Sequence, residues 1–212
     1  VSRLKKLMAE AELFLHLHDG WGFHYPEYVS KWRNPKRYGQ SIITDADRFT
    51  CDSGEELDLK GWAKGVLGEV NGKIGKDKYH LHYFNTETWK SDTPYPAMKK
   101  TATWYALQKH CLPAFGVETS KHLPSLEMKV RHHNYVINAF MDRMDIVPEN
   151  PQIFLPKPKL SYAVVNVDGK PRILEAGQTL WVEKGDRLTV THLEANYQRG
   201  VSCDVAGYGG LN

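Results

Sequence analysis

The stretch "LFLHLHDGWGF", residues 13–23, delivers two histidines and an aspartate to a glycine-rich turn. A catalytic zinc ion usually takes three protein ligands from His, Glu, Asp or Cys, and a nearby carboxylate moves protons. His18 is a candidate ligand, because a strand that stops at Asp19 and Gly20 presents it at the carboxyl edge of a sheet, where α/β sites form. His16 faces the same side of that strand. The alternative is a pair of hydrogen-bonded histidines in or near a core, and spacing alone favours it.

The stretch "FGVETSKHLP", residues 115–124, places a carboxylate at the end of an apolar run. A glutamate held at the end of a strand can act as a general base, which makes Glu118 a candidate catalytic residue. The alternative is that Glu118 caps a helix or a turn.

The stretch "KWRNPKRYGQ", residues 31–40, groups basic side chains around a turn. Its arginines, Arg33 and Arg37, could bind a substrate carboxylate through the planar guanidinium fork. A solvated loop explains the same residues.

Two other histidine spacings could bind a metal. His80 and His82 alternate in "KYHLHYF", so both rings would face one side of a strand. An exposed strand face explains them equally well. His24 and Glu27 are three residues apart, but Pro26 disfavours a regular helix there, so chance is the better explanation.

Charge and composition exclude several classes of partner. The 28 basic and 25 acidic residues give a formal net charge of +3 without a long basic run, so nucleic acid and membrane surfaces have no support. No window approaches the ~18 consecutive apolar residues of a transmembrane helix. We therefore expect a small molecule or a peptide as the partner. The cysteines, Cys51, Cys111 and Cys203, predict neither a disulfide framework nor a Cys-x-x-Cys metal site.

The elements that must position these side chains follow an α/β pattern. Apolar runs predict strands at residues 11–18, 40–44, 78–84 and 111–119. Helical periodicity predicts a helix over residues 97–110 and another that Ser125 caps, with Leu126, Phe140 and Met144 on its apolar stripe. His132 and His133 are neighbours on the second helix, where adjacent side chains diverge, so they are not a chelating pair.

Composition changes at "VPENPQIFLPKPKL", residues 147–160, where prolines cluster. We expect an α/β domain over residues 1–147, a proline-rich linker over 148–159 and a small β domain over 160–212. Short strands separated by Gly-Asp turns predict an all-β sandwich there. The expected strands are "LSYAVVNV", "PRIL", "QTLWV", "RLTVTHL" and "GVSCDVAGYGG".

Two stretches together carry a resemblance to a known family. "LHLHDGWGFHYPEYVSKWRNPKRYGQSII" and "FGVETSKHLPSLEMKVRHHNYVINAFM" resemble the later half of zinc D,L-carboxypeptidases. This group of the carboxypeptidase A-like class trims peptidoglycan peptides and helps determine cell shape in helical and curved bacteria. "LSYAVVNVDGKPRILEAGQTLWVEKGDRLTV" resembles the β domain that follows their catalytic domain. The resemblance, weak over residues 45–95, implies an incomplete carboxypeptidase A-like α/β/α domain followed by a small all-β domain.

The resemblance implies a role for each candidate. His18 matches the family's last zinc ligand, and Glu118 matches its catalytic glutamate. Zn²⁺ would lower the pKa of a bound water, and Glu118 would take its proton and return one to the leaving amine. The implied substrate is a peptidoglycan stem peptide that loses diaminopimelate from a tripeptide, in the periplasm or cell envelope. Arg33 and Arg37 are the candidates for binding a substrate carboxylate.

One departure from the family pattern bears on zinc. The family's first two ligands are a His or Gln followed three residues later by Glu, upstream of the position of His18, and no such motif precedes His18 here. We therefore expect the C-terminal portion of a catalytic domain: a fragment, a separately produced piece, or one part of a site completed elsewhere. By itself the chain is not expected to hold catalytic zinc or to be active.

Three hypotheses remain open. An incomplete zinc carboxypeptidase requires His18 and Glu118 in one solvent-lined cleft. A non-catalytic protein of the same fold would bind peptide or glycan through the β domain and the "NPKR" turn. An unrelated metal-binding protein requires His80 and His82 to converge with His24 and Glu27.

Overall fold

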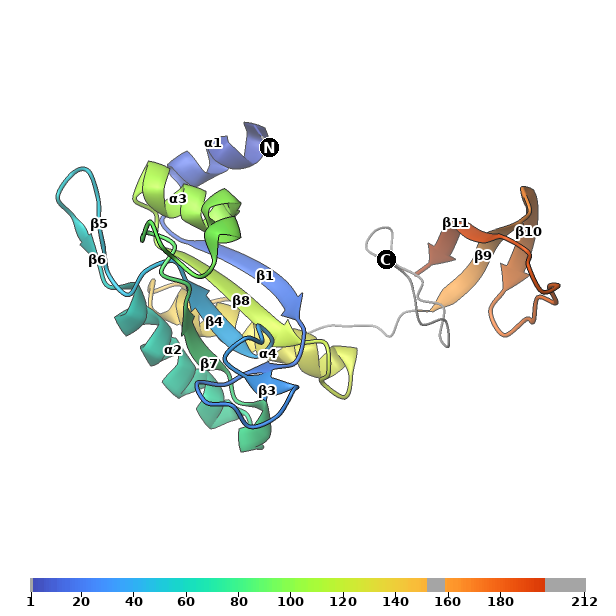
Figure 1. Ribbon diagram of the computed structural model, residues 1–212, viewed down its shortest axis with the longest axis horizontal. Helices are drawn as coiled ribbons and strands as arrows, with labels where there is room; N and C mark the ends of the chain where they lie inside the picture. Colours follow the sequence, from blue (N-terminus) through green and yellow to red (C-terminus); the bar gives the residue numbers. More distant parts are fainter. Residues whose placement is uncertain (1, 152–158, 197–212) are drawn as a thin grey trace. The chain divides into compact units, whose positions relative to one another are not determined.

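Figure 1 shows a computed structural model that describes residues 2–151 and 159–196. The chain divides into two compact units, residues 1–153 and residues 154–212. The elements of the first unit are α1 (Ser2–Glu10), β1 (Phe14–Gly20), β2 (Phe23–His24), β3 (Arg33–Asn34), β4 (Ser41–Thr44), β5 (Phe49–Thr50), β6 (Glu56–Leu57), α2 (Leu59–Lys73), η1 (Asp77–Tyr79), β7 (His82–Asn85), η2 (Pro96–Lys100), α3 (Ala102–His110), β8 (Ala114–Ser120) and α4 (Leu126–Asp142).

A mixed four-stranded sheet organises the first unit. Its strand order is β1-β8-β4-β7, in which β1 runs parallel to β8, β8 antiparallel to β4, and β4 parallel to β7. The helices and this sheet confirm the expected α/β class. The strands expected at residues 11–18, 40–44 and 111–119 overlap β1, β4 and β8.

Two hydrophobic clusters pack helices against the sheet, and α3 contributes to both, through Leu107 and Ala106. The larger cluster packs α2 and α4 against the side chains of Ile42, Phe115 and Val117, and Leu15 packs against it. The smaller cluster joins α1 and α3 to Ala114 and Phe14. Because side chains alternate along a strand, the even-numbered residues of β1 and β8 face away from α2 and α4. In Figure 1, α2 and α4 lie together, apart from α1 and α3.

The helix α4 begins where the sequence predicts it. Ser125 is the N-cap, and its side chain accepts a hydrogen bond from the backbone N–H of Met128. The expected apolar stripe is wrong at its start, because the first turn lies outside the core and leaves Leu126 57% exposed. The buried residues of the helix are His132, Val136, Ala139 and Phe140.

The strand expected over residues 78–84 is shorter than predicted, and β7 begins only at His82. The side chain of Asn71 donates to the carbonyl of Leu81 and accepts from its N–H. These two bonds occupy the backbone groups that a strand ladder would use. His80 consequently follows the short helix η1 and does not share a strand face with His82.

The second unit, described over residues 159–196, contains one three-stranded antiparallel sheet. Its strands are β9 (Leu160–Val167), β10 (Lys170–Glu175) and β11 (Leu188–Ala195), in the order β10-β9-β11. The expected strand "QTLWV" is wrong: Gln178 closes a turn back onto Glu175, and Trp181 is 90% exposed. The last expected strand, "GVSCDVAGYGG", and linker residues 152–158 lie outside the described residues.

A disulfide corrects the expectation drawn from the cysteine spacing. Cys51 is bonded to Cys111, with 5.6 Å between their Cα atoms and 60 residues between them in sequence. The bond ties the β5–β6 hairpin to the end of α3. Such bonds form and persist in oxidising compartments.

Among the residues that the structure describes, no helix has both the length and the apolar character needed to cross a membrane.

We expect reduction of this disulfide to lower the free energy of unfolding by about 4 kcal/mol at most, the loop-closure entropy of a loop this long. Urea unfolding with and without dithiothreitol measures the effect, and the double substitution Cys51→Ser with Cys111→Ser should reproduce it. Cys203→Ser is the control. A thiol titration that finds Cys51 and Cys111 free in the non-reduced protein contradicts the assignment.

Candidate functional site

The candidate ligand and the candidate base lie opposite each other on paired strands. β1 and β8 pair in parallel with His18 beside Glu118, and Asp19 beside Thr119. His18 and Glu118 are even-numbered positions, so both face away from α2 and α4. The structure thus brings together, on one face and near the carboxyl end of both strands, two residues 100 positions apart in sequence.

His18 is exposed and contacts a second imidazole. Its Nε2 lies 2.9 Å from Nε2 of His16, and the two ring centroids are 4.0 Å apart. Burial, and then the charge of His18, lower the pKa of His16. His16 therefore favours the neutral form in which an imidazole can bind a metal.

Glu118 has the properties of a proton-transfer group. Its Oε2 is buried and has no hydrogen-bond donor among the described residues. Burial, and then the charge of Asp19, raise the pKa of Glu118 to about 7, against the opposing effect of Lys121. A carboxyl group with this pKa exchanges its proton near neutral pH, as a general base or acid requires.

A close backbone approach explains the glycine that ends β1. A Cβ on Gly20 would lie 2.5 Å from the backbone N of Gly39 and 2.9 Å from Oε2 of Glu118. No side chain fits there, so only glycine allows the 38–39 segment to pass over the sheet next to the carboxylate. That segment contributes to the burial that raises the pKa of Glu118.

A polar network lies on the opposite face of the sheet, at the carboxyl ends of β1 and β8. Asp19 accepts hydrogen bonds from Thr119 Oγ1 (2.5 Å) and from Lys129 Nζ of α4 (2.9 Å). Burial raises the pKa of Asp19, but these two hydrogen bonds and the charges of Lys129 and His133 together outweigh it, so the net shift is downward. The ring of His133 also contacts Thr119 and the carbonyl of His18. Asp19 therefore stays ionised and joins β1 to β8 and α4.

Sequence reasoning missed the role of α4 in this network. Lys129 of this helix bonds to Asp19 of β1, a contact between residues 110 positions apart that helical periodicity does not predict. His132 and His133 do diverge as expected, because Nδ1 of His132 contacts Gln40 while His133 faces β8. Adjacent residues point in different directions around a helix, so the His132-His133 pair could have indicated that one of the two imidazoles faces the strand ends.

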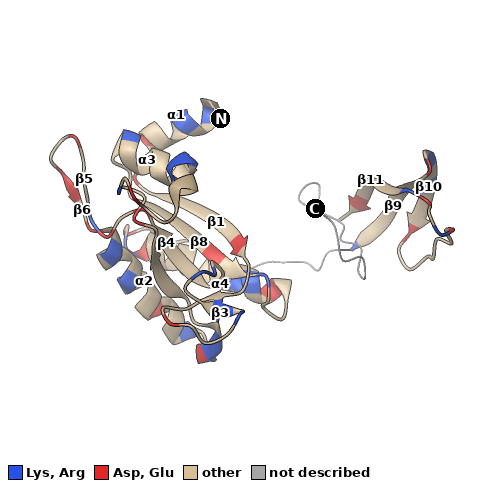
Figure 2. Ribbon diagram, in the orientation of Figure 1, with Lys and Arg blue, Asp and Glu red and all other residues tan. Residues whose placement is uncertain are grey.

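The two candidate arginines lie on the loop around β3, where Figure 2 shows basic residues. Arg33 donates to the carbonyl of Lys78 and lies over the ring of Phe23. Arg37 donates to the carbonyl of Lys31 and lies over the ring of Trp32. Within the described part of the chain, neither guanidinium bonds to Glu118, so substrate binding by Arg33 and Arg37 stays a prediction.

The histidines of the third hypothesis do not form a ligand set. Nε2 of His80 contacts the carbonyl of Ile74, and Nδ1 of His24 contacts the carbonyl of Arg37. His82 packs edge-on against Tyr25. Among the described residues, no three His, Cys, Asp or Glu side chains lie close enough together to bind one metal ion. The histidines of this hypothesis therefore do not share an ion.

The same finding limits the zinc site at His18. The described residues place imidazoles there, but they do not supply the three ligands of a catalytic zinc. The described side chains therefore do not fit a complete zinc site, and no metal-dependent step follows from them. The solvent-lined cleft expected around His18 and Glu118 is also not the cavity of about 390 Å³ in this unit, which residues of α2, η1 and α4 line.

Comparison with known families decides the assignment. A family model described as "Carboxypeptidase controlling helical cell shape catalytic" matches residues 1–166, well over half of the chain. The chain belongs to this family. The family resemblance inferred from the stretches that contain "LHDG" and "ETS" is thereby confirmed.

Solved structures of Csd4 from Helicobacter pylori share the fold with this member of the cell-shape carboxypeptidase family. A single-residue variant of Csd4 is 31% identical, with a TM-score of 0.61 over 71% of this chain and 36% of that one. An mDAP-bound form, described as a D,L-carboxypeptidase, is 27% identical, with a TM-score of 0.61 over 79% of this chain and 40% of that one. The chain thus spans 36 to 40% of the length of these Csd4 chains. No curated protein matches it.

We expect Glu118→Gln to stabilise the fold at pH 8 and to have little effect below pH 4.5. The folded pKa of about 7 exceeds the ordinary value of 4.5, so the native state binds more protons between these values and stability falls as pH rises through the window. Glutamine is neutral throughout, and the gain at pH 8 should be on the order of 1 kcal/mol after allowance for solvent screening.

Thermal unfolding at pH 4, 6 and 8 measures this gain. The control is Glu127→Gln, an exposed carboxylate paired with Arg131, which should show no comparable pH dependence. A Glu118→Gln variant less stable than wild type at pH 8 contradicts the raised pKa.

Proposed function

We propose that this chain supplies the proton-transfer glutamate and one zinc ligand of a D,L-carboxypeptidase that trims peptidoglycan stem peptides. The observation that carries the proposal is the pairing of Glu118 with His18 across β1 and β8, with a pKa of about 7 for the carboxyl group. Membership in the cell-shape carboxypeptidase family supports the reaction class.

Glu118 acts twice in the proposed reaction. As a carboxylate it takes a proton from the attacking water, and as the acid it returns a proton to the amine that leaves. A pKa near 7 allows both steps at neutral pH. Among the described residues, no group donates to its buried Oε2, so no hydrogen bond at this oxygen holds the carboxyl group in its ionised form.

His18 is the proposed zinc ligand, through an imidazole that is exposed at the same strand end. Since no three described side chains form a ligand group, at least part of the ligand set must come from outside the described residues. Arg33 and Arg37 are the proposed contacts for a substrate carboxylate. Both guanidinium groups lie on aromatic rings, which holds them in place without neutralising their charge.

The proposed substrate is a tripeptide stem that ends in diaminopimelate. Csd4 structures with bound mDAP and with a bound tripeptide support this choice. The proposed location is the periplasm or cell envelope. The family's link to cell shape supports it, and so does the Cys51–Cys111 disulfide, which needs an oxidising compartment.

A second function remains for a protein of this fold, namely binding of peptide or glycan without hydrolysis. The lack of a three-ligand group among the described residues favours it. It differs from the first proposal in one outcome: the stem peptide would bind and would not be cleaved.

We expect Glu118→Gln to lower kcat about 10²- to 10⁴-fold for release of diaminopimelate from a muramyl tripeptide, because it removes the general base. The assay uses the full-length polypeptide that carries this sequence, with zinc supplied. The wild-type kcat should rise with pH and level off above about pH 7, where Glu118 is ionised. Glu127→Gln, on an exposed turn of α4, is the matched control.

Two results would count against this account. Retention of wild-type kcat by Glu118→Gln excludes it as the base. Binding of the tripeptide by wild type without any release of diaminopimelate establishes the non-catalytic alternative.

A further inference from the structure

An exposed group of aromatic rings lies beside the candidate site. Trp21 and Trp32 stack at 6.4 Å between centroids, with 25° between their planes. The imidazole of His122 contacts both, at 5.4 Å from Trp21 and 4.5 Å from Trp32. We call these three rings the aromatic platform.

The platform continues the two strands that carry His18 and Glu118. Trp21 follows Gly20, the last residue of β1, and His122 lies two residues beyond Ser120, the last residue of β8. The platform therefore lies at the carboxyl edge of the two strands that carry His18 and Glu118.

The rings are fixed by backbone geometry. The N–H of Gly22 donates to Nδ1 of His122 at 3.1 Å. Gly22 has a φ of +68°, and a Cβ there would lie 2.6 Å from the carbonyl oxygen of Trp32. Only glycine allows this turn, so the platform is organised before any ligand binds.

The rings of Trp21 and Trp32 are not part of the hydrophobic core. Trp21 is 57% exposed and Trp32 is 40% exposed, and neither belongs to the hydrophobic clusters of the described residues. Contiguous exposed apolar surface of this kind marks a binding site more often than a structural feature.

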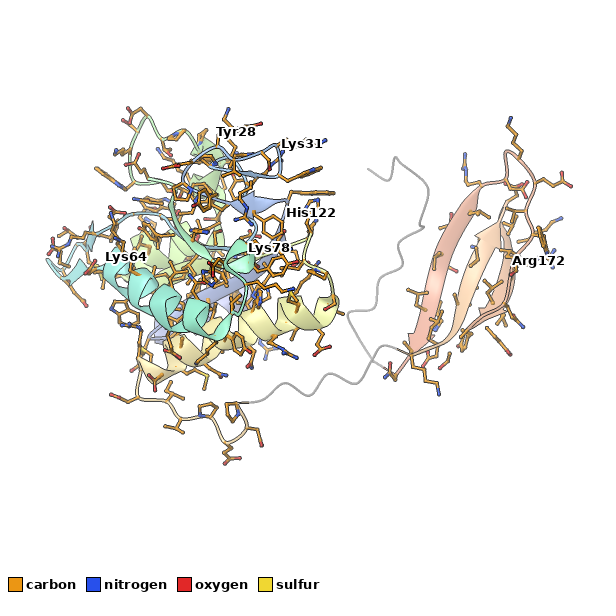
Figure 3. All side chains as sticks on the ribbon, turned by 90° about the horizontal axis from the view of Figure 1, so that it is seen from below. Tyr28, Lys31, Lys64, Lys78, His122 and Arg172 are labelled. Carbon is orange, nitrogen blue, oxygen red and sulfur yellow. A yellow bond between two sulfur atoms is a disulfide. The ribbon has the colours of Figure 1, made fainter. Side chains whose placement is uncertain are left out.

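Three cations flank the rings. Lys121 lies over Trp21 at 5.3 Å, and Lys31 and Arg37 lie over Trp32 at 5.1 and 5.3 Å. In the described ranges, no carboxylate forms an ion pair with any of the three. Lys31 and His122 project at the same edge of the first unit (Figure 3). The surface therefore offers aromatic faces together with positive charge that is not neutralised.

We propose that the aromatic platform binds the amino sugar to which the stem peptide is attached, while the peptide extends to Glu118. The proposal rests on the proposed function and names the substrate as glycan-linked stem peptide. The C–H groups on one face of a pyranose ring carry partial positive charge and pack on the negative face of an aromatic ring. Hydroxyl and amide oxygens, and the carboxylates of the stem, then accept hydrogen bonds from the flanking Lys and Arg side chains.

The experiment compares two ligands that differ only in the sugar: a muramyl tripeptide and the same tripeptide with an N-acetyl cap. Dissociation constants are measured by calorimetry on the full-length polypeptide with a chelator present, so that neither ligand is hydrolysed. Wild type should bind the muramyl tripeptide about 10-fold more tightly, a reasonable effect for one aromatic contact.

Trp21→Ala should remove this preference and leave the affinity for the N-acetyl tripeptide unchanged. Trp32→Ala should also remove the preference, but it takes away the ring on which Arg37 lies, so the affinity for both ligands should fall. The matched control is Trp89→Ala, because Trp89 is 55% exposed and also has a lysine, Lys90, over its ring, but it is not part of the platform. Trp89→Ala should keep the preference.

The outcomes separate this proposal from the proposed function. Equal affinity of wild type for the two ligands overturns the platform proposal alone. So does an equal loss of affinity for both ligands in the Trp21→Ala variant, which would make the platform a peptide contact. Failure of wild type to bind either ligand overturns the proposed function and the platform proposal together.

Discussion

The site depends on the in-register parallel pairing of β1 with β8. Because side chains alternate along each strand, a slip of one residue would turn either His18 or Glu118 to the opposite face of the sheet. The contacts of Asp19 with Thr119 and Lys129 hold this register from the face that α4 covers. Burial is the main reason that the pKa of Glu118 is raised, and the charge of the same Asp19 carboxylate adds to it. One polar network therefore fixes the geometry of the site and tunes its electrostatics.

The segment that follows β1 buries the Glu118 carboxyl group and exposes the rings of Trp21 and Trp32. Gly20 and Gly39 allow the backbone to pass close to Glu118, and this burial leaves Oε2 without a donor. An unpaired buried carboxyl group costs stability, and such cost is typical of residues kept for chemistry. Beyond Gly22 the same loop presents tryptophan rings to solvent. A substrate with a peptide part and a sugar part would use both.

The sequence predicts those parts of the fold that local patterns encode. Apolar runs indicate β1, β4 and β8, and the Ser125 cap indicates the start of α4, because strand alternation and capping act over a few residues. The "LHDG" and "ETS" motifs indicate His18 and Glu118 as candidate site residues. Contacts between distant residues leave no local trace: Cys51 and Cys111 are 60 residues apart. The side chain of Asn71 bonds to the backbone of Leu81, so β7 begins only at His82. The sequence pattern of residues 78–84 does not indicate this contact.

The central proposal is that His18 binds zinc beside Glu118. It is tested most directly by the zinc anomalous signal from crystals of the full-length polypeptide grown with zinc, and by the same measurement on His18→Ala. The account predicts a zinc ion about 2.0–2.1 Å from an imidazole nitrogen of His18, next to the Glu118 carboxylate, and no zinc at that place in the variant. Zinc bound at His80 or His82, or a site near Glu118 that persists in His18→Ala, would contradict it.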